Sequence, residues 1–121
     1  MESILIVDDD VNLCKALSEE LREVGYDTQY LTSGEGVLDY VKSNRVDLLL
    51  LDLKMPGKNG FDLLHDFEFE HIDLRVIVLT AYADVKSAID SAKLGATDFI
   101  SKPYDFDELL ITIRRTVQRE A

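Results

Sequence analysis

Short apolar runs alternate with helical patterns along the chain, and this alternation limits the fold more than any other feature of the sequence. The apolar runs predict five β-strands, at residues 3–7, 26–31, 46–51, 76–79 and 98–101. Apolar residues at helical spacing predict five helices, at residues 13–24, 36–42, 61–69, 84–94 and from Asp105 onward. Five strand–helix units in series are typical of an α/β domain with a parallel sheet.

The third strand candidate indicates how the strands are ordered. It is apolar on both faces, as expected of a central strand that helices cover on both sides. Right-handed crossover connections then leave few topologies. We therefore predict a flavodoxin-like (βα)5 three-layer sandwich with a parallel sheet of strand order 2-1-3-4-5.

The bulk properties of the chain exclude several classes of protein. Its 121 residues suit one domain, and the longest wholly apolar run, residues 48–51, is too short to span a membrane. The formal net charge of −11 would repel nucleic-acid phosphates, so this segment is not expected to bind nucleic acid directly. The N-terminus lacks the regions of a signal peptide and Cys14 is a single cysteine, so we expect a cytoplasmic protein.

Polar residues follow four of the five strand candidates. Asp8 and Asp9 follow the first strand, Asp52 the third, Thr80 the fourth and Lys102 the fifth. Parallel strands end at the same edge of a sheet, and doubly wound folds bind their ligands at that edge. The five side chains are therefore expected to converge on one site.

This set of side chains suits phosphoryl transfer assisted by a metal ion. Clustered carboxylates repel one another and need a cation at neutral pH. Oxygen ligands favour Mg²⁺, with Mn²⁺ as the alternative, and these positions hold no histidine or cysteine for zinc. Lys102 would add a positive charge and Thr80 a hydrogen-bond donor, so that Asp52 could act as a carboxylate nucleophile.

Each of these residues also has an ordinary structural interpretation. Asp10 and its neighbours could cap the following helix, Asp52 could form a turn, Thr80 could end a strand, and Lys102 could be a solvated surface residue. If all of these structural interpretations held, side chains suited to one reaction would have come together at four strand ends by coincidence. Other phosphate-binding sites fit poorly, because the chain lacks a P-loop motif and the loop after the first strand is acidic rather than glycine-rich.

Four motifs identify a resemblance to response-regulator receiver domains, which extends over essentially the full length of the chain. The motifs are Ile4-Leu5-Ile6-Val7-Asp8-Asp9-Asp10, Leu51-Asp52-Leu53-Lys54-Met55-Pro56-Gly57, Leu79-Thr80-Ala81 and Phe99-Ile100-Ser101-Lys102-Pro103. Each motif alone would be weak, whereas the four in this order are highly specific.

The resemblance implies roles for the acidic residues. Asp52 is expected to be the phosphoacceptor. Asp8 and Asp9 are expected to form the metal pocket with Asp52, and Asp9 is the better candidate for a direct ligand. The backbone carbonyl of Lys54 is expected to be a further ligand.

The resemblance also implies a switch. Thr80 and Lys102 are expected to bind the phosphoryl oxygens, and a cis peptide bond between Lys102 and Pro103 would place the lysine. On phosphorylation, the Thr80 hydroxyl would move toward the phosphoryl group and Phe99 would swing inward behind it. Many members of this family have tyrosine at this position. Phe99 has no hydroxyl to form the hydrogen bond that tyrosine could make, and it could also be a simple core aromatic.

The implied function is that of a signalling module and not of an enzyme with a separate substrate. A sensor histidine kinase would phosphorylate Asp52, and the surface of the fourth helix, fifth strand and fifth helix would then control an output domain or downstream protein, or form a homodimer. Residues 80–108 are similar to the receivers of nitrogen-regulator-C-like transcription regulators. Because the last helix reads as uncapped up to Ala121, we expect residues 1–121 to be the N-terminal receiver domain of a longer regulator.

Two alternatives remain. A stand-alone phosphorelay receiver would have nearly the same sequence. A haloacid-dehalogenase-like phosphatase also uses an aspartate nucleophile, but such enzymes place a second aspartate two positions later, where this chain has Lys54. The sequence does not identify the kinase, the signal, the output, the phosphoryl lifetime or the oligomeric state.

Overall fold

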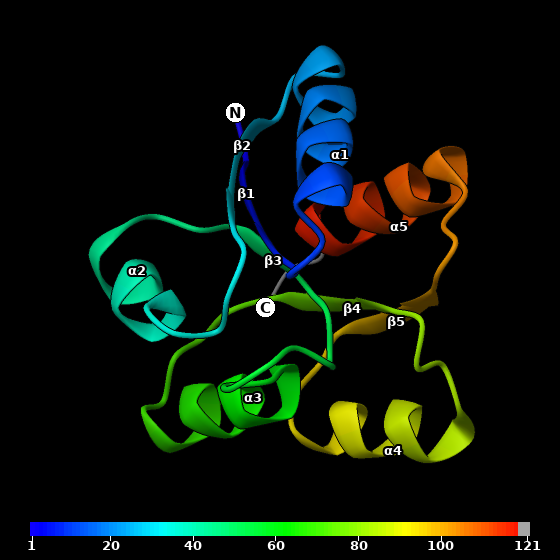
Figure 1. Cartoon of the computed structure of the whole chain (residues 1–121). Helices are drawn as coiled ribbons and strands as arrows, with labels where there is room; N and C mark the ends of the chain where they lie inside the picture. Colours follow the sequence, from blue (N-terminus) through cyan, green and yellow to red (C-terminus); the bar gives the residue numbers. More distant parts are fainter. Residues whose placement is uncertain (119–121) are drawn as a thin grey trace.

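Five parallel strands form one sheet in the computed structural model, which describes residues 1–118 (Figure 1). The strands are β1 (Ser3–Val7), β2 (Asp27–Leu31), β3 (Leu48–Leu51), β4 (Val76–Thr80) and β5 (Asp98–Ser101). Their order is β2-β1-β3-β4-β5, and every neighbouring pair is parallel. The predicted fold class and strand order are therefore confirmed.

Helices cover both faces of the sheet, so the domain has three layers (Figure 1). One layer contains α1 (Val11–Glu23) and α5 (Phe106–Gln118), and the other contains α2 (Val37–Ser43), α3 (Gly60–Phe69) and α4 (Val85–Lys93). Within residues 1–118, no helix is both long and apolar enough to cross a membrane. The expectation of an uncapped helix end at Ala121 lies outside the described residues.

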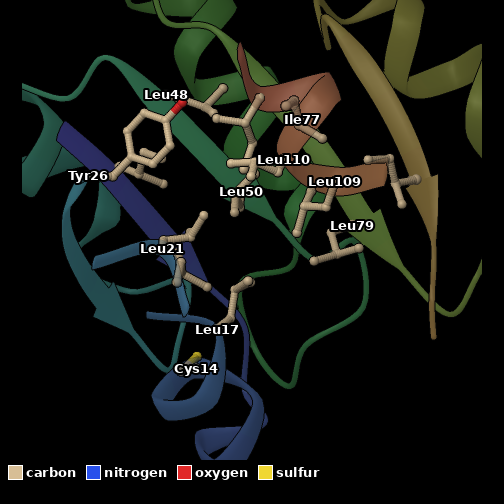
Figure 2. Packing of buried hydrophobic residues seen from close by; sticks show 14 residues of the cluster. Cys14, Leu17, Leu21, Tyr26, Leu48, Leu50, Ile77, Leu79, Leu109 and Leu110 are labelled. Atoms are coloured by element: carbon tan, nitrogen blue, oxygen red, sulfur yellow. The ribbon is translucent and has the colours of Figure 1, made fainter. Parts of the chain in front are cut away.

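The alternation of side chains along each strand divides the core into two clusters. In β1, Ile4 and Ile6 pack toward α1 and α5, where they join Leu17 and Leu109 in one cluster (Figure 2). Leu5 and Val7, which alternate with them along the strand, pack on the opposite face with α2 and α3. Because helices bury both faces of β1, β3 and β4, these strands are apolar except for Ser3 and Thr80 at their ends, and β3 is apolar throughout, as its sequence indicated.

Side-chain caps fix the starts of several helices. Asp10 caps α1 by accepting a hydrogen bond of 3.1 Å from the backbone N–H three residues later, so its interpretation as a helix cap is confirmed. Asp105 likewise accepts a bond of 3.2 Å from the N–H of Glu108 at the start of α5. A reciprocal capping box that the sequence analysis did not identify links Asn59 and Asp62 in α3.

Helix α4 presents its apolar side to solvent. The sequence places Val85, Ala88, Ile89 and Ala92 on one face of this helix, yet Val85 is 76% exposed and Ile89 is 49% exposed. Ser91 is buried instead, and its hydroxyl donates a hydrogen bond to the backbone carbonyl of Ala88. Because this internal bond satisfies the hydroxyl, a small polar residue can face the core and leave the apolar stripe outside.

Gly60 allows α3 to start directly beneath the end of β3. A Cβ atom at this position would lie 2.4 Å from the backbone oxygen of Asp52 and 2.7 Å from the Cα of Leu53. We predict that Gly60→Ala lowers the free energy of unfolding by about 1–3 kcal/mol, because the backbone itself has to move. Urea unfolding measures the loss, and amide NMR shifts at Asp52 and Leu53 should change with it.

Gly95→Ala is the control, since Gly95 has a φ of 99° but no atom within 4 Å of an added Cβ. This variant should lower the free energy of unfolding by about 1–2 kcal/mol through backbone strain alone and leave the amide NMR shift of Asp52 unchanged. A Gly60→Ala protein with wild-type stability and unchanged shifts at Asp52 would contradict the close approach.

Candidate functional site

A cleft of about 630 Å³ opens beyond the carboxyl ends of β1, β3 and β4. Its walls include side chains from the loops that follow β1, β3, β4 and β5, which lie far apart in the sequence: Asp8, Asp9, Asp52, Lys54, Tyr82 and Lys102. The parallel topology brings these loops to one edge of the sheet, as the sequence analysis anticipated.

Three carboxylates form the acidic part of this cleft. One carboxylate oxygen from each of Asp8, Asp9 and Asp52 lies within 4.8 Å of the other two. Asp8 and Asp52 are only 2% and 7% exposed, whereas Asp9 is open to solvent. A set of oxygen donors this close together, with one face open, fits a hard divalent cation such as Mg²⁺.

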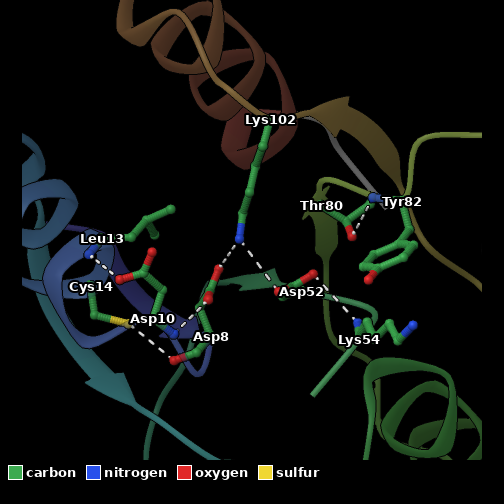
Figure 3. A network of polar contacts seen from close by, with 9 residues as sticks. All are labelled: Asp8, Asp10, Leu13, Cys14, Asp52, Lys54, Thr80, Tyr82 and Lys102. Carbon is green, nitrogen blue, oxygen red and sulfur yellow. Dashed lines mark hydrogen bonds and ion pairs between the residues drawn. The ribbon is translucent and has the colours of Figure 1, made fainter. Parts of the chain in front are cut away.

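Lys102 bridges two of the carboxylates (Figure 3). Its Nζ lies 2.6 Å from Oδ2 of Asp8 and 3.4 Å from Oδ2 of Asp52, and its side chain is 17% exposed. Three negative charges and this one positive charge leave a formal charge of −2 on the four groups, which matches the charge of a divalent cation.

The pKa values of both Lys102 and Asp8 are raised above their ordinary values, but for different reasons. Burial alone would lower the pKa of Lys102, but its hydrogen bond to Asp8 and the charges of Asp8 and Asp52 raise it above the ordinary value. Burial raises the pKa of Asp8, although the contact with Lys102 partly offsets this effect. The lysine is therefore firmly protonated beside a carboxylate that water solvates poorly.

Backbone groups orient both buried carboxylates. Oδ1 of Asp8 accepts a hydrogen bond of 2.9 Å from the N–H of Asp10, and Oδ1 of Asp52 accepts one of 3.4 Å from the N–H of Lys54. On the Lys102 side, the backbone N–H of Lys102 donates to the carbonyl of Thr80 at 2.9 Å, and the following peptide bond is cis. The lysine is thus tied to the end of β4 as well as to the acidic cluster.

The two expected switch residues lie beside the cleft and not in its walls. Thr80 is fully buried, and its Oγ1 accepts a hydrogen bond of 3.2 Å from the backbone N–H of Tyr82 (Figure 3). Phe99 is half-buried and packs against the core cluster on the α2–α3 side of the sheet.

Tyr82 is a cleft residue that the sequence analysis missed. The Nζ of Lys54 lies 4.4 Å from the centroid of the Tyr82 ring, so a cation–π contact spans the mouth of the cleft. The available signal was its place two residues after Thr80, in the loop that leaves the carboxyl end of β4.

Comparison with known proteins is consistent with this geometry. The family model of the response regulator receiver domain matches residues 4–114. Sporulation initiation phosphotransferase F of Bacillus subtilis is 37% identical over 114 residues, which cover 94% of this chain and 92% of that protein. The DNA-binding transcriptional regulator NtrC of Klebsiella pneumoniae is 36% identical over 112 residues, which cover 93% of this chain but only 24% of the regulator.

Solved structures give the same result. The response regulator protein TrrA from Thermotoga maritima, in complex with Mg(2+)-BeF, superimposes with a TM-score of 0.85 at 34% identity, over 96% of this chain and 99% of TrrA. The chain therefore belongs to the response-regulator receiver domain family, and its relatives include regulators of the nitrogen-regulator-C-like group.

Proposed function

We propose that this domain is a phosphorylation-activated switch that accepts a phosphoryl group on Asp52 from a sensor histidine kinase, with Mg²⁺ bound. Mn²⁺ is the alternative metal ion. The observation that carries the proposal is the position of Lys102 Nζ between Asp8 and Asp52, at the edge of a cluster of three carboxylates. The structure of the TrrA relative in complex with Mg(2+)-BeF supports the proposal that this domain binds Mg²⁺ when it is phosphorylated.

Under this proposal, each group has a part in the transfer. An Oδ atom of Asp52 attacks phosphorus while the bond between phosphorus and the kinase histidine breaks, and the histidine recovers a proton from solvent. Lys102 is already held beside Asp52 and would pair with the incoming phosphoryl oxygens. The carboxylates of Asp8, Asp9 and Asp52 and the carbonyl of Lys54 would hold the metal ion. When bound, Mg²⁺ offsets the negative charge of the carboxylates and of the phosphoryl group.

The switch would run from Thr80 to the surface of α4, β5 and α5. The Thr80 hydroxyl would leave its contact with Tyr82 for a phosphoryl oxygen, and Phe99 would move into the space behind it. The surface that responds carries exposed apolar side chains, with Val85 76% exposed and Ile111 61% exposed. Such side chains suit a contact with an output domain or with a second copy of the domain.

We propose a transcription-regulator domain as the output, with residues 1–121 as the N-terminal receiver of a longer cytoplasmic protein. The match over 24% of the length of a DNA-binding regulator supports this arrangement, and the net charge of −11 supports a DNA contact through another part of such a protein. A stand-alone phosphorelay receiver is the second candidate, because the chain covers 92% of the sporulation phosphotransferase. In both cases the domain is a phosphoacceptor and not an enzyme acting on a separate substrate.

The phosphoacceptor can be tested by mass. With Mg²⁺ and acetyl phosphate, wild-type protein should gain one phosphoryl group that is labile to acid and base, and Asp52→Asn should gain none because the nucleophile is gone. Intact-mass spectrometry reads both results. Full labelling of Asp52→Asn would remove Asp52 from this role, and steady turnover of p-nitrophenyl phosphate by the wild type would favour a phosphatase.

The metal site is tested at Asp9, which is exposed and lies in the acidic cluster. Asp9→Ala should weaken Mg²⁺ binding by about tenfold or more, since even the loss of a group that only supports metal ligands costs 10–100-fold. Asp105→Ala is the control, because it removes an exposed aspartate that caps α5 outside the cleft. It should lose about 1 kcal/mol of stability and keep its Mg²⁺ affinity. Equal affinities for wild type and Asp9→Ala in an NMR titration would place the ion elsewhere.

Thr80 separates phosphorylation from switching. Thr80→Ala should still accept the phosphoryl group but should fail to reach the full active conformation, since one hydrogen bond to a charged group contributes roughly 1.5–3 kcal/mol, or about a ten- to hundredfold shift in population. Thr80→Ser retains the hydroxyl and should switch nearly as the wild type does. Amide NMR shifts of α4 with and without beryllofluoride report the switch, and a complete wild-type response in Thr80→Ala would disprove the coupling.

A further inference from the structure

The loop between β3 and α3 is held in place at both ends. It spans residues 54–59 and contains the Lys54 carbonyl that we assign to the metal site. At its base, the N–H of Gly60 donates to the carbonyl of Leu53 at 2.9 Å, and the capping box between Asn59 and Asp62 fixes its other end. Between these two ends lies Gly57, in a left-handed conformation with a φ of 72°. Because glycine is conformationally free, a further contact is needed to fix the backbone there.

Two contacts hold this part of the loop. The ammonium group of Lys58 pairs with Asp66 in α3. The backbone is held by Glu35, which lies in the loop between β2 and α2. Its Oε1 accepts a hydrogen bond of 3.2 Å from the backbone N–H of Lys58, 23 residues further along the chain. Its Oε2 accepts a bond of 3.1 Å from the hydroxyl of Ser33. Its own backbone N–H and that of Lys58 hold the pKa of the Glu35 carboxyl below its ordinary value, so the group is ionised at neutral pH.

The two loops fit together closely at this contact. A Cβ atom at Gly34 would lie 2.1 Å from the backbone oxygen of Lys58, and one at Gly57 would lie 2.8 Å from Oε1 of Glu35. At Gly34 a larger residue would push the two backbones apart, whereas at Gly57 it would displace the Glu35 carboxylate, and the φ of 72° itself favours glycine there. The contact is therefore a fitted junction between two loops and not an incidental surface contact.

We propose that Glu35 is a positioning residue for the metal site. By holding the N–H of Lys58, it restrains the Gly57 hinge and so keeps the loop that carries the Lys54 carbonyl in place beside the carboxylate cluster. The proposal rests on the metal site assigned above and extends it to a part of the chain outside the cleft. Glu35 would touch neither the metal ion nor the phosphoryl group.

A residue of this kind should act on metal affinity and leave the chemical step alone. If the loop is free to move, the Lys54 carbonyl must be ordered when Mg²⁺ binds, and that cost weakens binding. Once Mg²⁺ is saturating, the loop is in place and phosphorylation should proceed at the wild-type rate. A residue needed for the chemistry itself would slow phosphorylation at every Mg²⁺ concentration.

The test compares Glu35→Ala with Glu35→Gln, whose side-chain carbonyl can still accept the Lys58 hydrogen bond. In metal-free protein, the Lys58 amide of Glu35→Ala should exchange with solvent about tenfold faster or more, because a hydrogen bond to a charged acceptor is lost. Its dissociation constant for Mg²⁺, followed by NMR titration, should rise about three- to tenfold, a part of the same loss. Glu35→Gln should lie closer to wild type in both measurements.

Glu19→Ala is the matched control, since it removes the same charge from the exposed side of α1. It should leave both measurements unchanged. Faster exchange at Lys58 with an unchanged dissociation constant would make Glu35 a purely structural residue and overturn the proposal, as would unchanged exchange. If Glu35→Gln bound Mg²⁺ as weakly as Glu35→Ala does, the charge of Glu35 and not its positioning of the loop would account for the affinity, and the proposal would be wrong. A wild-type protein that binds no Mg²⁺ would overturn the metal site itself along with this role.

Discussion

Repulsion among three carboxylates determines how the candidate site is built. Asp8, Asp9 and Asp52 hold oxygens within 4.8 Å of one another, and two of the three are almost completely buried. Lys102 offsets part of this charge through its contacts with Asp8 and Asp52. Burial raises the pKa of Asp8, and the contact with Lys102 counteracts this effect and so favours the ionised form that can bind a metal ion. The remaining negative charge makes the site receptive to a divalent cation.

The fold supplies the rigidity that this arrangement needs. Asp8 and Asp52 directly follow β1 and β3, two adjacent central strands whose side chains are buried on both faces. The two apolar clusters fix these strands, so the carboxylates cannot separate to relieve their repulsion. The parts expected to move lie further out: Thr80 and Phe99 beside the cleft, and α4, whose apolar stripe faces solvent. A rigid site next to a loosely packed helix is a suitable construction for a switch.

The sequence was informative for features that depend on the hydrophobic periodicity of one element or on the residue at the end of one strand. The alternation of strands and helices predicted the topology, and the polar strand ends predicted which residues meet, because parallel strands share a carboxyl edge. Features that depend on contacts between separate loops or helices were not predictable in this way. The outward orientation of the apolar face of α4, the hydroxyl of Thr80 turned toward Tyr82, and the contact of Glu35 with Lys58 all follow from tertiary packing. A local pattern contains no information on such partners.

Under the proposed function, the carboxylate of Asp52, held beside Lys102, becomes an acyl phosphate. Borohydride reduces an acyl phosphate of aspartate to homoserine, which marks the modified position permanently. Protein treated with acetyl phosphate, then reduced, digested and sequenced by tandem mass spectrometry, reports that position directly. We predict homoserine at position 52 in samples that contain Mg²⁺ and its near absence when the metal ion is chelated. Homoserine at position 8 or 9, or equal labelling without a divalent ion, would contradict the account.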